Sequence, residues 1–444
     1  MTVTTVRQRR RLPLVLRNRA FGAVWLGQVL TQAAVRMFQV GVSWWLVAYA
    51  VGAGRGLASG LFMAVSTLPA VALAPVVARA VSRLAHRSVL RTAAATAGAA
   101  VLLLALVAYG GAPPTVAAYA ATLVLASCQA FFDPCLTTSV PELVDDEDIE
   151  AATGFELSTQ SLASLGGALL GALIVDEAGM TGLAAGCAAA YLAAALLVTT
   201  VRFRPAVAQE PQEPQDGAES GAGAARGLRE VLAGLPAIRK ILVCFAAANL
   251  FTTAVFVVIP LYTKSELGGG GSTVALLEAG LGTGTLLGSV TGARVPGRPT
   301  RLGAGLLAVM AAAFALAGLV AGRLVLAGCL VVAGWCVGVI GVRFVALFQR
   351  LVPPADKPGF FAVMQAVLGA SFPVASLLFG LLGDHLPART LCLVQAAGLV
   401  PAAIALALLR EPGADDRERG PADVDRQPHP SDPSPEFVAT GGER

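Results

Sequence analysis

A row of polar side chains lies on one face of the first long apolar run, residues 20–50. The members of this row, the polar stripe, are Gln28, Gln32, Arg36, Gln39 and Ser43. Each residue of a helix is turned by about 100° from the last, so these side chains fall within about 80° of arc. An arginine in the middle of a membrane span costs at least about 2.5–3.5 kcal/mol, so Arg36 should face a water-filled cavity or a carboxylate. We interpret the stripe as a cavity wall that binds a solute, with polar contacts between helices as the alternative.

Two carboxylates are placed where they could take up and release a proton. Glu156 and Glu278 lie on polar faces of the fifth and eighth apolar runs. Burial raises the pKa of a carboxyl group and a nearby arginine lowers it, so movement between two such surroundings can be coupled to proton uptake. Arg36 and Arg343, which also lie within apolar runs, are the possible partners. The alternatives are that Glu156 begins a helix, that Glu278 is exposed near the outer membrane face, and that Arg343 anchors its helix.

Other apolar runs carry thinner polar rows. Gln129, Gln160 and Asn249 lie in the fourth, fifth and seventh runs, each in line with further polar residues. They are additional candidates for solute binding. Asp133, at the cytoplasmic end of its run beside Pro134, is predicted to be structural.

The composition excludes several classes of protein. Of 444 residues, 56% are hydrophobic and only 14% are charged, against roughly 25% in an ordinary soluble domain. Together with a mean hydropathy of +0.71, this excludes a soluble enzyme and predicts a protein that crosses a membrane several times. The net charge of +4 gives no argument for nucleic acid. No clustered catalytic set and no phosphate-binding loop is present, so neither an enzyme nor ATP hydrolysis is expected.

The cysteines and glycines point to packing rather than to chemistry. The seven cysteines lie in or beside apolar runs, without a C-x-x-C pair, and are predicted to be buried thiols. No metal site, disulfide or cofactor is expected. In the eighth run, small residues at four-residue spacing predict close helix packing rather than a nucleotide loop, since no strand precedes them. These are Gly280, Gly284 and Gly288, with Gly282 between them.

Twelve apolar runs approach the roughly 20 residues that a membrane-spanning helix needs. The first six cover residues 20–50, 56–78, 89–110, 114–136, 150–175 and 180–201. The second six cover residues 236–261, 272–293, 302–321, 323–348, 359–383 and 387–409. The division at Gly322 rests on length alone, because 302–348 is nearly continuous and too long for one span.

The order of these runs predicts an all-α membrane protein with twelve transmembrane helices in two six-helix bundles. A segment rich in Pro, Gln, Glu and Gly separates the halves and reads as a flexible linker. Residues from Gly227 to Lys240 read as an amphipathic helix on the membrane surface. The predicted parts are a basic N-terminus over 1–19, bundles over 20–201 and 236–410, a cytoplasmic linker over 202–235, and a disordered tail over 411–444.

The positions of the 32 lysines and arginines predict the orientation. With twelve spans, successive loops alternate between the two sides of the membrane. Only Arg55, Lys264, Arg323 and Arg389 fall in the loops of one side, and only Arg36 and Arg343 fall within spans. All the others lie in the termini and in the loops of the opposite side. The positive-inside rule makes that side cytoplasmic, so both termini are expected in the cytoplasm.

Three segments of the chain form a recognisable set. They are Leu16-Arg17-Asn18-Arg19-Ala20-Phe21 leading to Trp25-Leu26-Gly27-Gln28, Leu68-Pro69 followed by the basic loop through Arg83 and Arg87, and Phe131-Phe132-Asp133-Pro134 followed by Val140-Pro141-Glu142. In order and spacing they resemble the major facilitator superfamily over residues 12–410, and within it the bacterial branch that includes macrolide and siderophore exporters. Three positions depart from that branch. Val35 stands where it usually has Asp, Ser82 where it has Asp, and Gly167 where it has Pro.

The resemblance implies two bundles that rock about a central site, proton-driven antiport, and a gating loop that contains Arg83 and Arg87. We therefore expect an exporter of a small amphipathic organic molecule, such as a drug, an antibiotic or a siderophore, in the bacterial cytoplasmic membrane. The expected partners are the solute, protons and the lipid bilayer, with no nucleic acid, and the protein is expected to be a monomer. The alternatives are an importer of a nutrient or siderophore, or a membrane scaffold or receptor that transports nothing.

Overall fold

The computed structural model describes residues 14–144, 148–201, 236–352 and 357–409, and all of its regular structure is helical. The predicted linker over 202–235, the tail over 411–444 and most of the basic N-terminus lie outside the described residues. So does the first part of the amphipathic helix expected from Gly227, whose last residues belong to α10.

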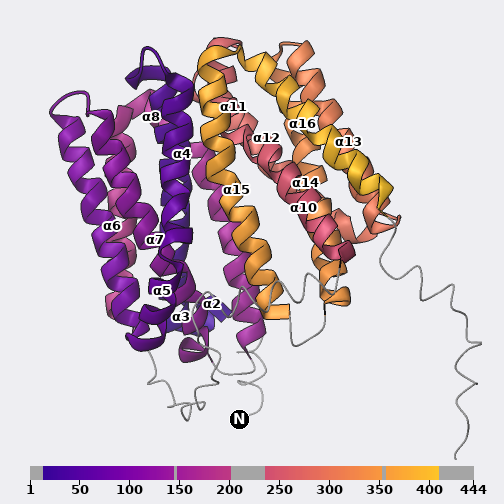
Figure 1. Cartoon of the computed structure of the whole chain (residues 1–444). Helices are drawn as coiled ribbons and strands as arrows, with labels where there is room; N and C mark the ends of the chain where they lie inside the picture. The colour runs from indigo at the N-terminus through magenta and orange to yellow at the C-terminus, as the bar shows by residue number, and fades with distance from the viewer. Residues whose placement is uncertain (1–13, 145–147, 202–235, 353–356, 410–444) are drawn as a thin grey trace, which may run out of the picture.

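Two groups of helices follow one another along the chain (Figure 1). The first group is α2 (Leu14–Arg17), α3 (Arg19–Trp45), the π-helical turn η1 (Leu46–Ala50), α4 (Arg55–Ala72), α5 (Ala74–Arg83), α6 (His86–Tyr109), α7 (Thr115–Leu143) and α8 (Ile149–Thr200). The second group is α10 (Pro236–Thr253), α11 (Val255–Ser265), α12 (Gly271–Thr291), the 3₁₀ turn η3 (Gly292–Arg294), α13 (Pro299–Leu319), α14 (Arg323–Leu351), α15 (Lys357–His385) and α16 (Ala388–Leu408).

The ends of several helices follow from single residues. The Asn18 side chain accepts hydrogen bonds from the backbone N–H groups of Ala20 and Phe21 and so caps α3. Pro299 begins α13, where a missing N–H costs nothing. Gly179 adopts a φ of 64° inside α8. That conformation is unfavourable for residues with a Cβ, so Gly179 divides α8 into two successive spans.

The helices account for the twelve predicted spans. Ten stretches of the described residues are long and apolar enough to cross a membrane. One of them, Leu165–Thr200, includes the break at Gly179 and supplies parts of two spans. The polar α3 is not among the ten, although its 27 residues are long enough to cross. The predicted division at Gly322 is confirmed, since α13 ends at Leu319 and α14 begins at Arg323.

The two bundles contact each other through equivalent helices. Within the first bundle α8 packs on α3 and α6, and within the second α12 packs on α14 and α13 on α16. Between the bundles α4 packs on α15, and α8 packs on α12. In span order these contacts join span 2 to span 11 and span 5 to span 8. A two-fold rotation that exchanges the two halves of the chain also exchanges these two contacts, as expected for a two-repeat transporter.

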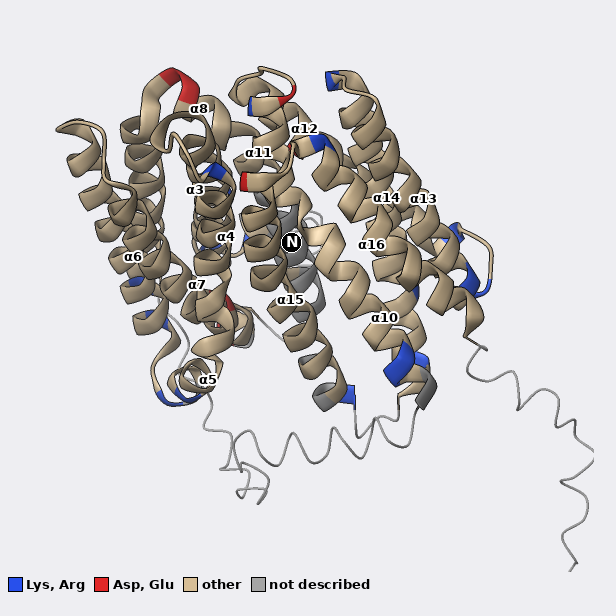
Figure 2. Ribbon diagram, turned by 45° about the horizontal axis from the view of Figure 1, so that its top comes forward, with Lys and Arg blue, Asp and Glu red and all other residues tan. Residues whose placement is uncertain are grey.

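Side-chain polarity varies along the helices as a bilayer requires. Figure 2 shows Lys and Arg mainly at helix ends, with few charges midway. Large apolar side chains such as Leu103, Leu196 and Leu324 are exposed on the helix surfaces. In water such a surface would aggregate, whereas in a membrane it contacts lipid. In the orientation predicted from the lysines and arginines, the outer ends of the helices are those near Arg55, Lys264, Arg323 and Arg389, and the opposite ends are cytoplasmic.

Candidate substrate and coupling site

The polar stripe of α3 faces protein rather than lipid. Gln28 and Gln32 are only 3% and 7% exposed, and Arg36 and Gln39 are half-buried. Helix α8 approaches closely at Arg36, because a Cβ added at Gly167 would lie 2.4 Å from the Ala33 carbonyl oxygen and 3.0 Å from the Arg36 Cβ. Glycine at this position thus lets α3 and α8 touch where the arginine emerges.

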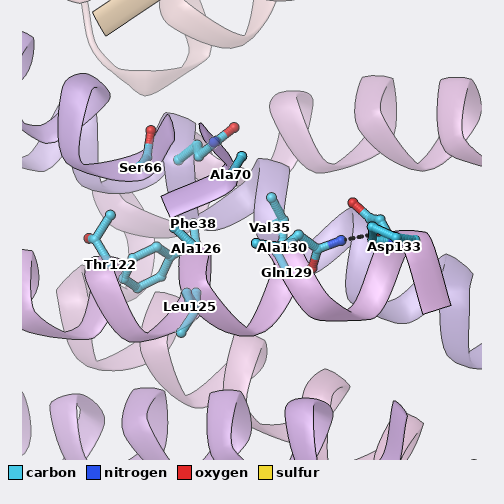
Figure 3. Close-up of a pocket in the computed structure, with 12 residues that line it drawn as sticks. Val35, Phe38, Ser66, Ala70, Thr122, Leu125, Ala126, Gln129, Ala130 and Asp133 are labelled. Atoms are coloured by element: carbon cyan, nitrogen blue, oxygen red, sulfur yellow. Dashed lines mark hydrogen bonds between the residues drawn. The ribbon is translucent and has the colours of Figure 1, made fainter. Parts of the chain in front are cut away.

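A cavity of about 260 Å³ lies among α3, α4 and α7 (Figure 3). Its lining residues are Val35, Phe38, Gln39, Ser66, Ala70, Thr122, Leu125, Ala126, Gln129, Ala130, Asp133 and Pro134. Most of this wall is apolar, with amide and hydroxyl groups and one carboxylate set into it. Gln39 and Gln129 are the predicted solute-binding residues that line it. Val35, where an acidic residue is usual, contributes an apolar surface instead.

Asp133 joins the polar rows of two helices. The Gln32 amide nitrogen on α3 donates to Asp133 Oδ1 at 2.8 Å, and the Gln129 amide nitrogen on α7 donates to the same oxygen. Figure 3 shows the second of these bonds at the edge of the cavity. Two predicted binding glutamines are therefore held by a carboxylate that the sequence assigned to a structural role. Asp133 fixes both amides beside the cavity.

Replacing Asp133 by alanine should lower the stability of the protein. Both glutamine amides would lose their acceptor while partly buried, and an unsatisfied buried polar group costs about 1–3 kcal/mol. We expect Asp133→Ala to lower the thermal unfolding midpoint in detergent by several degrees, and Asp133→Asn, which keeps one acceptor oxygen, to lower it less. Equal midpoints for both variants and the parent protein would contradict this role.

Arg36 reaches across the interface between the bundles. Its Nη1 donates to Gln39 Oε1 at 2.9 Å, and its guanidinium carbon lies 5.6 Å from the centre of the Phe256 ring on α11. Such an arrangement is a cation–π contact. The Arg36 Nε is buried and makes no hydrogen bond within the described part of the chain. The guanidinium thus keeps donor capacity at the place where the two halves meet.

Glu278 of α12 is the carboxylate that interacts with Arg36. Its side chain is only 6% exposed, so the alternative of an exposed position near the outer face is wrong. The Arg36 charge acts electrostatically on the Glu278 carboxyl. Among the described residues the two make no ion pair within 4 Å. The arginine and the carboxyl group that it acts on therefore belong to different bundles.

Two other predicted site residues bond to neighbouring segments of their own bundle. Asn249 of α10 donates to the Leu368 carbonyl oxygen at 3.0 Å and to Ser371 Oγ at 2.6 Å, both on α15. Arg343 of α14 donates to the Gly297 carbonyl oxygen at 2.6 Å, in the loop before α13. These contacts have the geometry of helix-to-helix and helix-to-loop anchors, and they do not bring either residue to Arg36.

The predicted gating residues lie at the cytoplasmic end of the first bundle. Arg83 is exposed at the end of α5, and the Arg87 guanidinium donates to the Thr199 carbonyl oxygen at 2.5 Å near the end of α8. Nearby, His86 Nδ1 and Glu142 Oε1 lie 2.6 Å apart, which joins α6 to α7. The side chains of Glu156 and Gln160 lie outside the described residues.

The packing prediction for the glycines is confirmed, and the prediction of buried thiols is confirmed for five of the seven cysteines. A Cβ at Gly284 would lie 2.1 Å from the Val331 carbonyl oxygen, and one at Gly288 would lie 2.2 Å from that of Trp335. Gly282 faces α8 instead, near Leu165. Cys128 and Cys244 are half-buried and the other cysteines are buried.

Three residues at the interface escaped the sequence prediction. Phe256 is one apolar residue among many, and nothing in its spacing marks it. Asp176 and Asp384, which are described below, sit at the outer ends of spans 5 and 11. A comparison of the two repeats offers a signal for them, because the two carboxylates occupy matching places.

Comparison with known proteins identifies the family. A sequence profile described as "Major Facilitator Superfamily" matches residues 24–327, well over half of the chain. None of the curated proteins matches the chain by sequence.

Among solved structures, the nucleoside transporter NupG has a TM-score of 0.69 at 12% identity, over 87% of this chain and 98% of that one. A bacterial homolog of the human lysosomal transporter Spinster, in an inward-facing and unoccupied conformation, has a TM-score of 0.69 at 13% identity, over 88% and 96%. A D-xylose-proton symporter has a TM-score of 0.66 at 13% identity, over 88% and 97%. At such identities the structures share the fold alone, but together with the profile they lead to one conclusion: this chain belongs to the Major Facilitator Superfamily of secondary transporters.

Proposed function

We propose that this transporter exports a small amphipathic organic molecule across the bacterial cytoplasmic membrane in exchange for protons. The observation that carries the proposal is the arrangement around Arg36. A polar stripe runs from the cavity in the first bundle to Arg36, whose charge acts electrostatically on the buried Glu278 carboxyl of the second bundle. One helix face thus connects the proposed solute pocket to the surroundings of a buried carboxyl group, which we assign the exchange of a proton.

The cavity supports the choice of solute. Apolar side chains such as Phe38 and Leu125 favour a hydrophobic body, and the amides of Gln39 and Gln129 offer donors and acceptors for a few polar groups. Its volume of about 260 Å³ lies just below the range of about 300–1,000 Å³ that is typical of ligand pockets. A small molecule, or the part of a larger one that the first bundle covers, would fit. Helices α3 and α4, which wall the cavity, also contact α11 of the second bundle.

Glu278 and Arg36 support proton coupling in place of the usual acidic residue at position 35. A buried carboxyl is stable when it is protonated or when a cation faces it. The two partners belong to different bundles, so rocking of the bundles changes their separation. Movement that draws Arg36 away favours proton uptake by Glu278, and movement that returns the arginine favours release.

The direction of transport is proposed from the resemblance to exporters and is open to a direct test. Purified protein is reconstituted into liposomes, and uptake of amphipathic cations, anions and neutral compounds is measured with and without an acidic lumen. Accumulation that requires the acidic lumen supports antiport. Accumulation that instead requires an acidic exterior supports the importer, and solute movement that is unaffected by either gradient contradicts proton coupling.

A further inference from the structure

The outer end of α15 supplies a cap for a helix of the other bundle. Asp384, next to the last residue of α15, accepts hydrogen bonds from the backbone N–H of Gly56 at 2.7 Å and of Leu57 at 3.1 Å. These groups belong to the first turn of α4. The first N–H groups of a helix have no partner within it and carry the positive end of its dipole, so a carboxylate is favourable there.

Asp176 makes the corresponding contact from the first bundle. Its Oδ2 accepts the backbone N–H of Gly271 at the start of α12. Its Oδ1 accepts hydrogen bonds from Trp44 Nε1 at 2.6 Å and from the Tyr49 hydroxyl at 2.8 Å, which hold the carboxylate in place. The aspartate thus belongs structurally to the first bundle and caps a helix of the second.

The two contacts are related by the repeat. Asp176 lies at the outer end of span 5 and caps span 8, whereas Asp384 lies at the outer end of span 11 and caps span 2. Neither capped helix has a cap of its own, since the residues before them are Gly54 and Gly270, which lack a side-chain acceptor. In both repeats the opposite bundle provides the acceptor that the local sequence omits.

Backbone packing at the same two places is as close as glycine permits. A Cβ at Gly56 would lie 2.3 Å from the Gly380 carbonyl oxygen, and one at Gly271 would lie 2.2 Å from that of Ala172. The capping carboxylates therefore lie at two places where helices of different bundles pack backbone to backbone. Separation of the outer ends must break these hydrogen bonds and expose both helix starts to water.

We propose that Asp176 and Asp384 are paired latches that hold the outer ends of the bundles closed and so set the balance between the two states of the transporter. The inference rests on the proposed alternating-access function, but it concerns an equilibrium that exists without solute. Loss of a latch raises the population of the outward-open state. Loss of both raises it further, because each latch closes a different pair of helices.

A reporter for opening is available on α15. Ser376 is fully buried, and its backbone lies against Gly60 of α4. In Ser376→Cys the new thiol stays hidden until α4 and α15 separate at the outer side. Labelling by a membrane-impermeant maleimide is followed in right-side-out vesicles, and the rate for the protein without this substitution is subtracted to remove labelling of native cysteines. Gly56→Leu, which wedges the same crossing open, shows that the reporter responds.

Asp176→Ala and Asp384→Ala should each raise the labelling rate about tenfold, as expected for loss of one charge-assisted contact. The double variant should label faster than either, and Asp→Asn variants, which keep an acceptor oxygen, should lie between. Glu177→Gln is the matched control, because this exposed neighbour makes no inter-bundle hydrogen bond in the described structure, and its rate should equal that of the parent. A folded double variant, whether Ala or Asn, that labels within twofold of the parent while Gly56→Leu labels quickly would overturn the proposal. If the latch variants label faster but the protein transports no amphipathic compound, the latch proposal is supported and only the proposed solute is rejected.

Discussion

A Glu278→Gln variant is expected to lose proton-driven accumulation of solute down to the level of protein-free liposomes while it still binds that solute. Glutamine has the size of a protonated glutamate but cannot ionise, so the step in which Arg36 draws near and the proton leaves is abolished. Binding should persist, because Glu278 does not line the cavity in the first bundle. Accumulation under an imposed pH gradient and solute binding by the same preparation are the two measurements.

The control for this variant is Glu177→Gln, which also removes a carboxylate, but from an exposed place on α8. It should accumulate solute as the parent does. Exchange of labelled for unlabelled solute without a pH gradient should continue in Glu278→Gln, because exchange needs the bundles to rock but no net proton transfer. Full gradient-driven accumulation by Glu278→Gln would reject the coupling role.

The residue that the Asp176 latch caps and the coupling carboxylate lie on the same helix, α12. Gly271, which Asp176 caps, begins α12, and Glu278 follows about two turns later, roughly 10 Å along the axis. A rigid helix released at its outer end changes direction as a whole. We expect opening at Asp176 to move Glu278 relative to Arg36, which would link the proton site to the outer gate without an intervening loop.

The sequence predicted the architecture well because its signals are local. Length and hydropathy each depend on a single stretch of chain, so even the division at Gly322 was predicted correctly. The inward direction of the α3 stripe was also predictable, because exposing Arg36 to lipid would cost too much free energy. What these signals omit is the identity of the partner on another helix.

The candidate site shows the limit of such signals. A glutamine or asparagine in an apolar helix looks the same whether it faces a solute or a neighbouring helix. Gln39 and Gln129 line the cavity, whereas Asn249 bonds to α15, and no feature of the sequence separates them. A structural role for Asp133 was predicted, but its partner on α3 was not, because Gln32 lies 101 residues earlier in the chain.

The position of Arg36 depends on Gly167 of α8, which packs against α3 beside the arginine. Gly167→Val should abolish transport, because its Cβ would lie 2.4 Å from the Ala33 carbonyl oxygen and 3.0 Å from the Arg36 Cβ. Helix α3 cannot yield there without moving the arginine away from Phe256 and Glu278. Overpacking of this kind costs typically about 1–3 kcal/mol, so the protein should still fold, with a lowered thermal midpoint and no accumulation of solute.

Gly166→Val is the matched control, because it introduces the same side chain one residue earlier. A Cβ at Gly166 meets no atom within 4 Å, so this variant should keep the parental rate of transport. Both variants share the cost in helix propensity that valine brings, and the difference between them isolates the contact with α3. Equal transport by the two would show that the α3–α8 crossing does not position the coupling arginine. Loss of transport in Gly167→Val alone would show that displacing Arg36 by the width of one side chain prevents the exchange of a proton for a solute.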